Sequence, residues 1–145
     1  MVMIVNNKYN LERFIDAQNE FYEIALKEIK NGKKETHWMW FIFPQLKYLG
    51  NSEMSLYYGI SNKEEAILYL KNAILRNRLI NISKELYKLN DNINNIMGPI
   101  DSLKLNSSMT LFKYIEPDIE IFSNIIEKFY DGEEDQKTLR MLKVR

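Results

Sequence analysis

The chain has 145 residues, of which 46% are hydrophobic and 12% aromatic, enough for one ordinary domain with a hydrophobic core. Twenty basic residues balance twenty acidic ones, which argues against a polybasic membrane binder or a strongly cationic nucleic-acid coat. Cysteine is absent and histidine occurs once, which excludes zinc–thiolate and multi-histidine metal sites. We therefore expect no metal and no cofactor.

The N-terminus does not have the pattern of a signal peptide. Its apolar run ends after five residues, before Asn6, and no small-residue cleavage site follows. The longest apolar run, 38–43, is far short of the roughly 20 residues that cross a membrane. We expect a cytoplasmic protein.

Hydrophobic residues recur at helical spacing in the first half of the chain. Asn10 is a candidate N-cap for a long helix that ends before Gly32. Thr36 is a candidate cap for a short helical turn over 38–43, although the aromatic and β-branched residues there also suit a strand. We favour the helix because no partner strand follows. Another short helix is predicted over 52–58.

The second half is also predicted to be helical. Ser61 and Glu64 form an S-x-x-E capping box for a helix through Leu70, and a longer helix spans 75–89. The polar stretch 90–95 is predicted to be a loop. Three further helices are expected to begin near Asp101, Pro117 and Asp135. The prediction is one all-α domain, residues 1–145, with about seven or eight helices and short loops.

The segment 32–45 is the first candidate for chemistry. It contains the only histidine, His37, and both tryptophans, Trp38 and Trp40, just after Lys34 and before Gln45. Imidazole is a natural general acid or base, indole can stack on a planar ligand, and lysine can neutralise a phosphate. The alternative is that the tryptophans belong to the core and the histidine is a hydrogen-bonding residue at a helix end.

The segment 101–112 is the second candidate. On a helix, Asp101, Lys104 and Ser108 share one face, with Ser107 in a neighbouring row of hydroxyl groups. Such a face can bind a phosphate or a sugar, and a desolvated lysine can act as a base or nucleophile. The alternative is that Asp101 caps the helix and the small residues let another helix approach.

Two long strings give the chain a family resemblance. They are His-Trp-Met-Trp-Phe-Ile-Phe-Pro-Gln at 37–45 and Ser-Ser-Met-Thr-Leu-Phe at 107–112. They resemble the signature of a bacterial family of unknown function, domain-of-unknown-function 1810, which often carries the mistaken label calpastatin. The resemblance implies a compact all-helical domain and no particular activity. Shorter matches extend it along the chain, at Phe14, Ala17-Gln18, 49–52, 58–60, Glu65-Ala66, Tyr69-Leu70, Asp101, Lys104-Leu105, Asp135 and Thr138-Leu139.

Three functions remain open from the sequence. The first is a small-molecule binding protein or enzyme for a nucleotide or nucleotide-sugar. Its catalytic candidates are His37, Asp101 and Lys104, and its binding candidates are Lys34, Trp38, Trp40, Gln45, Ser52, Ser107 and Ser108. The second is a protein-interaction module without catalysis, such as a regulator or a phage-borne inhibitor of host defence. The third and weakest is RNA binding through Trp38, Trp40 and nearby lysines.

Overall fold

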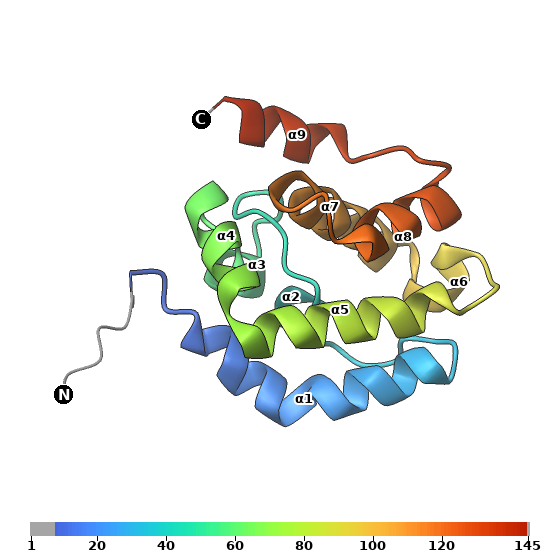
Figure 1. The fold of residues 1–145 in the computed structure, drawn as a ribbon. Helices are drawn as coiled ribbons and strands as arrows, with labels where there is room; N and C mark the ends of the chain where they lie inside the picture. Colours follow the sequence, from blue (N-terminus) through green and yellow to red (C-terminus); the bar gives the residue numbers. More distant parts are fainter. Residues whose placement is uncertain (1–7, 145) are drawn as a thin grey trace.

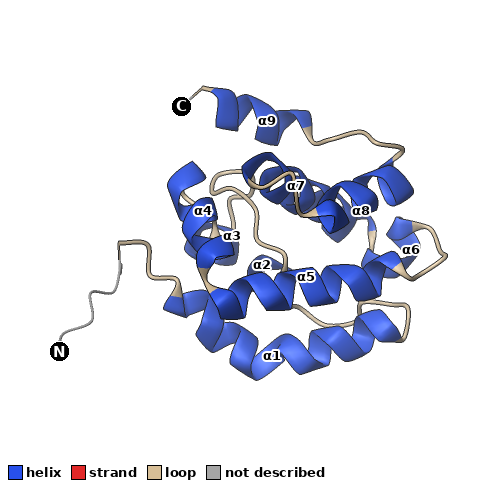
Figure 2. Ribbon diagram, in the orientation of Figure 1, coloured by secondary structure: helices blue, strands red, loops and turns tan. Residues whose placement is uncertain are grey.

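The computed structural model describes residues 8–144. In this range the chain forms nine helices, and the only strand-like pairing is an isolated parallel bridge between Leu46 and Ile60 (Figures 1 and 2). The predicted all-α class is confirmed. The helices are α1 (Glu12–Lys30), α2 (Met39–Ile42), α3 (Glu53–Tyr58), α4 (Lys63–Lys71), α5 (Ala73–Tyr87), α6 (Ile93–Met97), α7 (Pro99–Ile115), α8 (Glu120–Tyr130) and α9 (Gln136–Lys143).

The described residues contain more helices than the predicted seven or eight, because the polar stretch near residue 93 is partly helical. Asn92 caps α6 by accepting a hydrogen bond from the backbone N–H of Asn94 at 2.7 Å. Ile93, Ile96 and Met97 are then buried on one side. A few apolar residues at helical spacing therefore outweighed the loop-like composition.

Some helix starts follow the predicted capping chemistry, but the predicted Asn10 cap is wrong: Leu11 is the N-cap of α1, and no side chain caps that helix. Asp135 caps α9 as predicted, accepting the N–H of Thr138 at 3.1 Å. The capping box before α4 lies one residue later than predicted. Asn62 accepts the N–H of Glu65 at 2.9 Å, and Glu65 accepts the N–H of Ser61 at 2.7 Å. α7 begins at Pro99, before Asp101, because proline is preorganised for the first helical position.

α7 is the central helix of the fold. It packs against α8, α4, α6 and α9, and its residues Leu105, Met109, Leu111 and Phe112 are fully buried. Ser102, Ser107, Ser108 and Thr110 are also buried, and such short side chains let neighbouring helices approach α7 closely. Accessible residues lie near its N-terminal end, including Lys104, and in its last turn, including Tyr114.

α1 and α5 pack side by side in a second layer, and α5 also packs on α8. α1 and α9 lie at opposite ends of the molecule (Figure 1). None of the helices within residues 8–144 combines the length and apolarity needed to cross a membrane.

Candidate functional site

Two adjoining hollows meet at Gln45 and Lys104. The first, which we call the Trp40 pocket, is narrow and has room for about one water molecule. The second, the α7 groove, opens to solvent and has a volume of about 330 Å³. The Trp40 pocket is lined by Met39, Trp40, Phe43, Gln45, Ser55, Tyr58, Gly59 and Lys104. The α7 groove is lined by Gln45, Leu49, Gly50, Ile100, Leu103, Lys104, Ser107, Asp135 and Lys137.

Three polar groups of the Trp40 pocket have no hydrogen-bond partner among the described residues. The indole Nε1 of Trp40 is buried and unpaired. The Nζ of Lys104 lies 5.7 Å from the centroid of the Trp40 ring and makes no ion pair within residues 8–144. The side-chain amide of Gln45 is unpaired in the same range. Two donors and an amide are thus available to a ligand at one place.

Close backbone approaches at two glycines shape the pocket wall. A Cβ at Gly50 would lie 2.7 Å from the Oγ of Ser55 and 3.6 Å from the Nε2 of Gln45. A Cβ at Gly59 would lie 2.6 Å from the Cα of Lys47. The two backbone segments meet here because of the parallel bridge between Leu46 and Ile60. The backbone N–H of Ile60 donates to the backbone carbonyl of Gln45 at 2.9 Å. Gly59 is needed for its lack of a side chain because a Cβ there would strike backbone, whereas at Gly50 the nearest atom belongs to the Ser55 side chain, which can shift.

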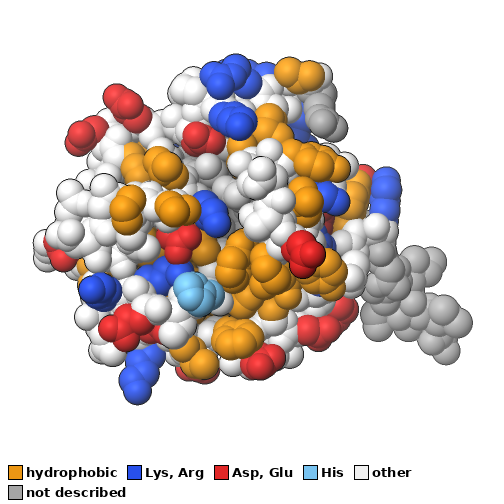
Figure 3. Space-filling model, turned by 180° about the vertical axis from the view of Figure 1, so that it is seen from behind, with side chains coloured by type: hydrophobic (Ala, Val, Ile, Leu, Met, Phe, Trp, Pro, Cys, Tyr) orange, Lys and Arg blue, Asp and Glu red, His pale blue; other side chains and the backbone are white. Residues whose placement is uncertain are grey.

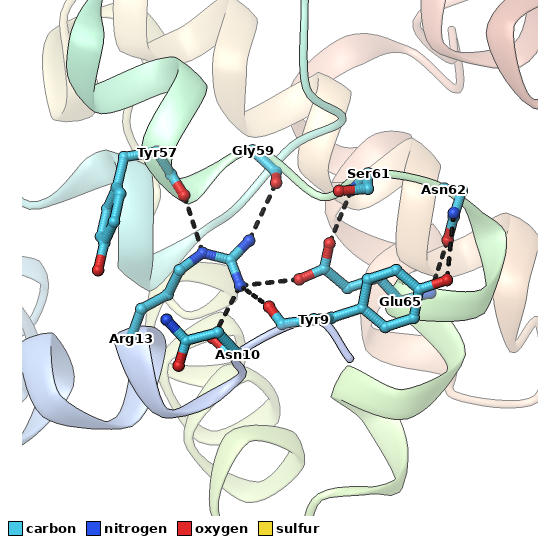
Figure 4. Close-up of polar contacts among 8 residues, drawn as sticks. All are labelled: Tyr9, Asn10, Arg13, Tyr57, Gly59, Ser61, Asn62 and Glu65. Carbon is cyan, nitrogen blue, oxygen red and sulfur yellow. Dashed lines mark hydrogen bonds and ion pairs between the residues drawn. The ribbon is translucent and has the colours of Figure 1, made fainter. Parts of the chain in front are cut away.

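A buried ion pair between Arg13 and Glu65 supports the backbone of this wall at Gly59 (Figure 4). The guanidinium of Arg13 lies 2.9 Å from the carboxylate of Glu65, and both side chains are almost completely buried. Arg13 also donates at 2.6–3.0 Å to four carbonyl oxygens, those of Tyr9, Asn10, Tyr57 and Gly59. These contacts tie the residues just before α1 to α4 and to the end of α3, so Arg13 fixes the backbone that forms the Gly59 wall.

A separate cluster, which we call the Glu28 clamp, joins the end of α1 to the start of α2. The carboxylate of Glu28 accepts hydrogen bonds from the indole Nε1 of Trp38 at 2.9 Å and from the backbone N–H of Glu35 and of Thr36. It also accepts from the Thr36 hydroxyl, so Thr36 bonds to α1 and does not cap α2. Partial burial acts to raise the pKa of Glu28. The four hydrogen bonds outweigh it and lower that pKa to about 2.

The clamp continues to the start of α7 through an ion pair. The Nζ of Lys34 lies 2.8 Å from the carboxylate of Asp101, and the exposed fractions of the two side chains are 6% and 20%. The same ammonium donates to the carbonyl of Thr36 at 2.6 Å and lies 4.8 Å from the centroid of the Trp38 ring. All polar groups of this cluster therefore have partners.

The structure divides the residues predicted for one site into two groups. Trp40, Gln45, Lys104 and Ser107 come together at the Trp40 pocket and the α7 groove. Lys34, Trp38 and Asp101 lie in the Glu28 clamp, where Trp38 is fully buried and its ring has no face open to a ligand.

The remaining three predicted residues line neither hollow. Ser52 caps α3, accepting the N–H of Ser55 at 3.1 Å. Ser108 is fully buried, and its hydroxyl has no partner among the described residues. His37 is exposed, and Figure 3 shows the histidine at the edge of a broad band of hydrophobic side chains.

Sequence reasoning missed several lining residues because they carry no chemical signature of their own. Ser55, Tyr58 and Leu49 occur in ordinary short segments, and Gly50 looks like a turn residue. Asp135 was recognised only as a cap, but its carboxylate also accepts the hydroxyl of Ser107 at 3.1 Å. This bond fixes the start of α9 beside the α7 groove.

The residues present do not assemble a metal site or a nucleophilic triad. Within residues 8–144 there is no group of three or more histidine, aspartate or glutamate side chains that could hold a metal ion. Ser108 is enclosed, whereas His37 is on the surface.

The comparisons with known proteins agree with the fold. The model of the family described as "Protein of unknown function (DUF1810)" matches residues 8–142, so the chain belongs to this family and the resemblance is confirmed. It is also similar to the conserved hypothetical protein Rv1873 from Mycobacterium tuberculosis, whose crystal structure was determined at 1.38 Å. The two share 40% identity and a TM-score of 0.93, over 95% of this chain and 99% of that one. No curated protein matches the chain.

Proposed function

We propose that this protein binds a small anionic ligand of the nucleotide or nucleotide-sugar class at the Trp40 pocket and the α7 groove. One observation carries the proposal: the Lys104 ammonium, the Trp40 indole N–H and the Gln45 amide meet at one pocket without partners within residues 8–144. A buried donor without a partner costs free energy, and a ligand oxygen would recover it.

The dimensions support a particular placement of such a ligand. The Trp40 pocket is too narrow for a ring, so it would receive only an anionic oxygen, between Lys104 and the indole N–H. The body of the ligand would lie in the α7 groove, whose volume is within the range of small-molecule sites. Leu103 and Ile100 would contact its apolar part, and the exposed Lys137 would face a second anionic group at the far end.

The proposal is limited to binding and assigns no catalytic step. A general acid or base must reach the reacting atom, and His37 lines neither hollow. Asp101 is engaged by Lys34 and lines neither hollow. Of the three residues first considered for catalysis, only Lys104 keeps a place in the proposed site, as a group that binds the anion.

The test is a thermal-shift and calorimetric screen with ADP, AMP and UDP-glucose. A ligand present at 100 times its Kd stabilises the folded protein by about 2.7 kcal/mol, which such a screen detects readily. We expect Lys104→Met and Trp40→Phe to lose this stabilisation, because one removes the cation and the other the indole N–H. His37→Ala is the matched control and should bind like the wild type. Equal binding by Lys104→Met and the wild type would contradict the proposal.

A second candidate is supported by a different feature of the same groove. Ile100 and Leu103 are adjacent on α7, and each is 71% exposed, which is high for aliphatic residues lining a hollow. Such a face suits an apolar segment of a protein partner, as expected of an interaction module or regulator. If this candidate is correct, Leu103→Asp would abolish partner binding, whereas the nucleotide screen would give no hit.

A further inference from the structure

A second crevice lies on the other side of residues 45–50 from the α7 groove, and it does not belong to the proposed ligand site. Its floor is apolar and is formed by Leu46, Met141 and Leu142. Lys47, Tyr48 and Lys63 form its walls. We call these last three residues, with Tyr114, the tyrosine–lysine surface. Its residues come from the loop before α3, the start of α4 and the end of α7.

The two lysines of this surface contact aromatic rings and no acid. The Nζ of Lys47 lies 5.7 Å from the centroid of the Tyr48 ring, and the Nζ of Lys63 lies 5.9 Å from that of Tyr114. Neither ammonium forms an ion pair within residues 8–144. The neighbour of Lys63 in sequence, Glu64, pairs instead with Lys8. The charges of Lys47 and Lys63 are therefore not neutralised by an ion pair within residues 8–144.

Tyr48 is held outward by an unusual backbone conformation. Its φ is +76°, in the left-handed region that bulky residues rarely adopt, and 70% of the residue is exposed. Strained positions of this kind persist where the surrounding structure requires them, and they are concentrated at functional sites. Here the strain presents an aromatic ring beside two cations.

The exposed residues of α1 and α9 differ in charge over part of each helix. Glu12, Asp16, Glu20 and Glu23 are exposed along α1, at one end of the molecule. α9, at the opposite end, carries exposed Arg140 and Lys143 beside the crevice residues Met141 and Leu142. Figure 3 shows basic side chains at the top of the molecule, the end where α9 lies, with acidic ones beside them. Neither end carries charge of one sign, because Lys27 and Lys30 are exposed on α1 and Glu133 is exposed before α9. The cations of α9 that adjoin the crevice residues are Arg140 and Lys143.

We propose that the tyrosine–lysine surface binds single-stranded nucleic acid, with phosphates at Lys47 and Lys63 and a base stacked on Tyr48. Cations alternating with exposed aromatic rings are the common feature of surfaces that bind single strands without sequence preference. A repeating polyanion also matches two separate cation–ring pairs and the adjacent charges of α9 better than one small anion does. The tryptophans suggested by the sequence are not part of this surface.

The experiment measures fluorescence anisotropy of a labelled oligouridylate of about 12 nucleotides over a series of KCl concentrations from about 25 mM upward. If Lys47, Lys63, Arg140 and Lys143 each neutralise a phosphate, the logarithm of the binding constant should fall with log salt with a slope of about −3. Lys47→Ala/Lys63→Ala should make the slope shallower by about 1.4. Tyr48→Gly, which also relieves the backbone, should weaken binding about tenfold with an unchanged slope.

Two controls keep the test specific. Lys33→Ala/Lys84→Ala removes two other exposed lysines and should leave the slope unchanged. Lys104→Met should also bind the oligonucleotide normally, so this proposal and the proposed ligand site can fail separately. Absence of binding at the lowest salt, or equal losses in the two double-lysine variants, would overturn the proposal. Equally strong binding of UMP would also overturn it, by making the crevice a small-anion site.

Discussion

The Glu28 clamp and the Trp40 pocket come from the same two segments of sequence, yet they differ in how their polar groups are satisfied. In the clamp, Trp38 donates to Glu28 and Lys34 pairs with Asp101. In the pocket, the indole of Trp40 and the ammonium of Lys104 have no such partners among the described residues. A tryptophan and a lysine are therefore available to a ligand only where the fold leaves their polar atoms unpaired.

The largest expected difference between the two regions comes from the same substitution at both tryptophans. Trp38→Phe removes a hydrogen bond to an ionised carboxylate and leaves a cavity in the core, so it should lower the free energy of unfolding by about 3 kcal/mol. Trp40→Phe removes an indole N–H that has no partner and should cost less than about 1 kcal/mol. Urea unfolding of both variants measures the two losses in the free energy of unfolding. Equal losses would show that the two indoles are equivalent.

The next difference concerns the two lysines. Lys34→Met leaves the Asp101 carboxylate without its partner in a largely buried position, which should cost about 2–3 kcal/mol. Lys104→Met removes a cation that has no ion pair within residues 8–144, so stability should change by no more than about 0.5 kcal/mol. Thermal unfolding at neutral pH compares the stability of the two variants with that of the wild type. A large loss in Lys104→Met would mean that this lysine is structural.

The pH dependence of stability should identify the clamp directly. The pKa of Glu28 is about 2 in the folded protein and about 4.3 in an unfolded chain. Its stabilisation is therefore fully present above about pH 4.3 and is lost as the pH falls toward 2. Glu28→Gln should be less stable than the wild type at pH 7 by about 1–2 kcal/mol, after allowance for partial exposure.

The measurement for Glu28 is urea unfolding of both proteins at a series of pH values. The difference between them should shrink between about pH 4.3 and pH 2, because the wild-type carboxylate then becomes protonated. Trp40→Phe serves as the control, since its stability relative to the wild type should not depend on pH in this window. A pH-independent difference for Glu28→Gln would contradict the assignment of the hydrogen bonds to the ionised carboxylate.

A small effect on stability, together with a loss of binding, is expected at the pocket wall. Gly50→Ala places a methyl group against the Ser55 hydroxyl and toward Gln45, whereas alanine by itself restricts the unfolded chain. These effects oppose each other, so stability should change by less than about 1 kcal/mol. Binding of any nucleotide found by the screen should weaken, because the wall moves into the site. Calorimetry on this variant and on the Gly32→Ala control, at a glycine outside both hollows, compares the losses.

The helices could largely be predicted from the sequence because their apolar spacing and capping residues are local signals. The Asp135 cap and the helical turn after Trp38 both follow from neighbouring residues. Two predictions from local signals were wrong. α6 lies where the composition predicts a loop, and α7 starts at Pro99 and not at Asp101. In both places the packing of a few apolar residues, or one proline, overrode a polar or capping signal.

The site was only half predictable, because spacing along one helix does not show which side chains find partners across the fold. Trp40, Gln45 and Lys104 were predicted and meet at the pocket. Asp101 was placed beside Lys104 by helical spacing, but it pairs with Lys34 from another segment. Glu28 gave no signal in the sequence, although it accepts the indole N–H of Trp38.

The sequence by itself determined the all-α class, the family and the two segments in which the unusual polar and aromatic residues lie. Those properties depend on periodicity, on caps and on residue identity, which are read over a few neighbouring positions. Only the tertiary structure decided which tryptophan is core, which lysine is unpaired among the described residues, and which lysines lie beside exposed tyrosine rings. These depend on partners brought together from distant positions, since burial and pairing are properties of the packed chain.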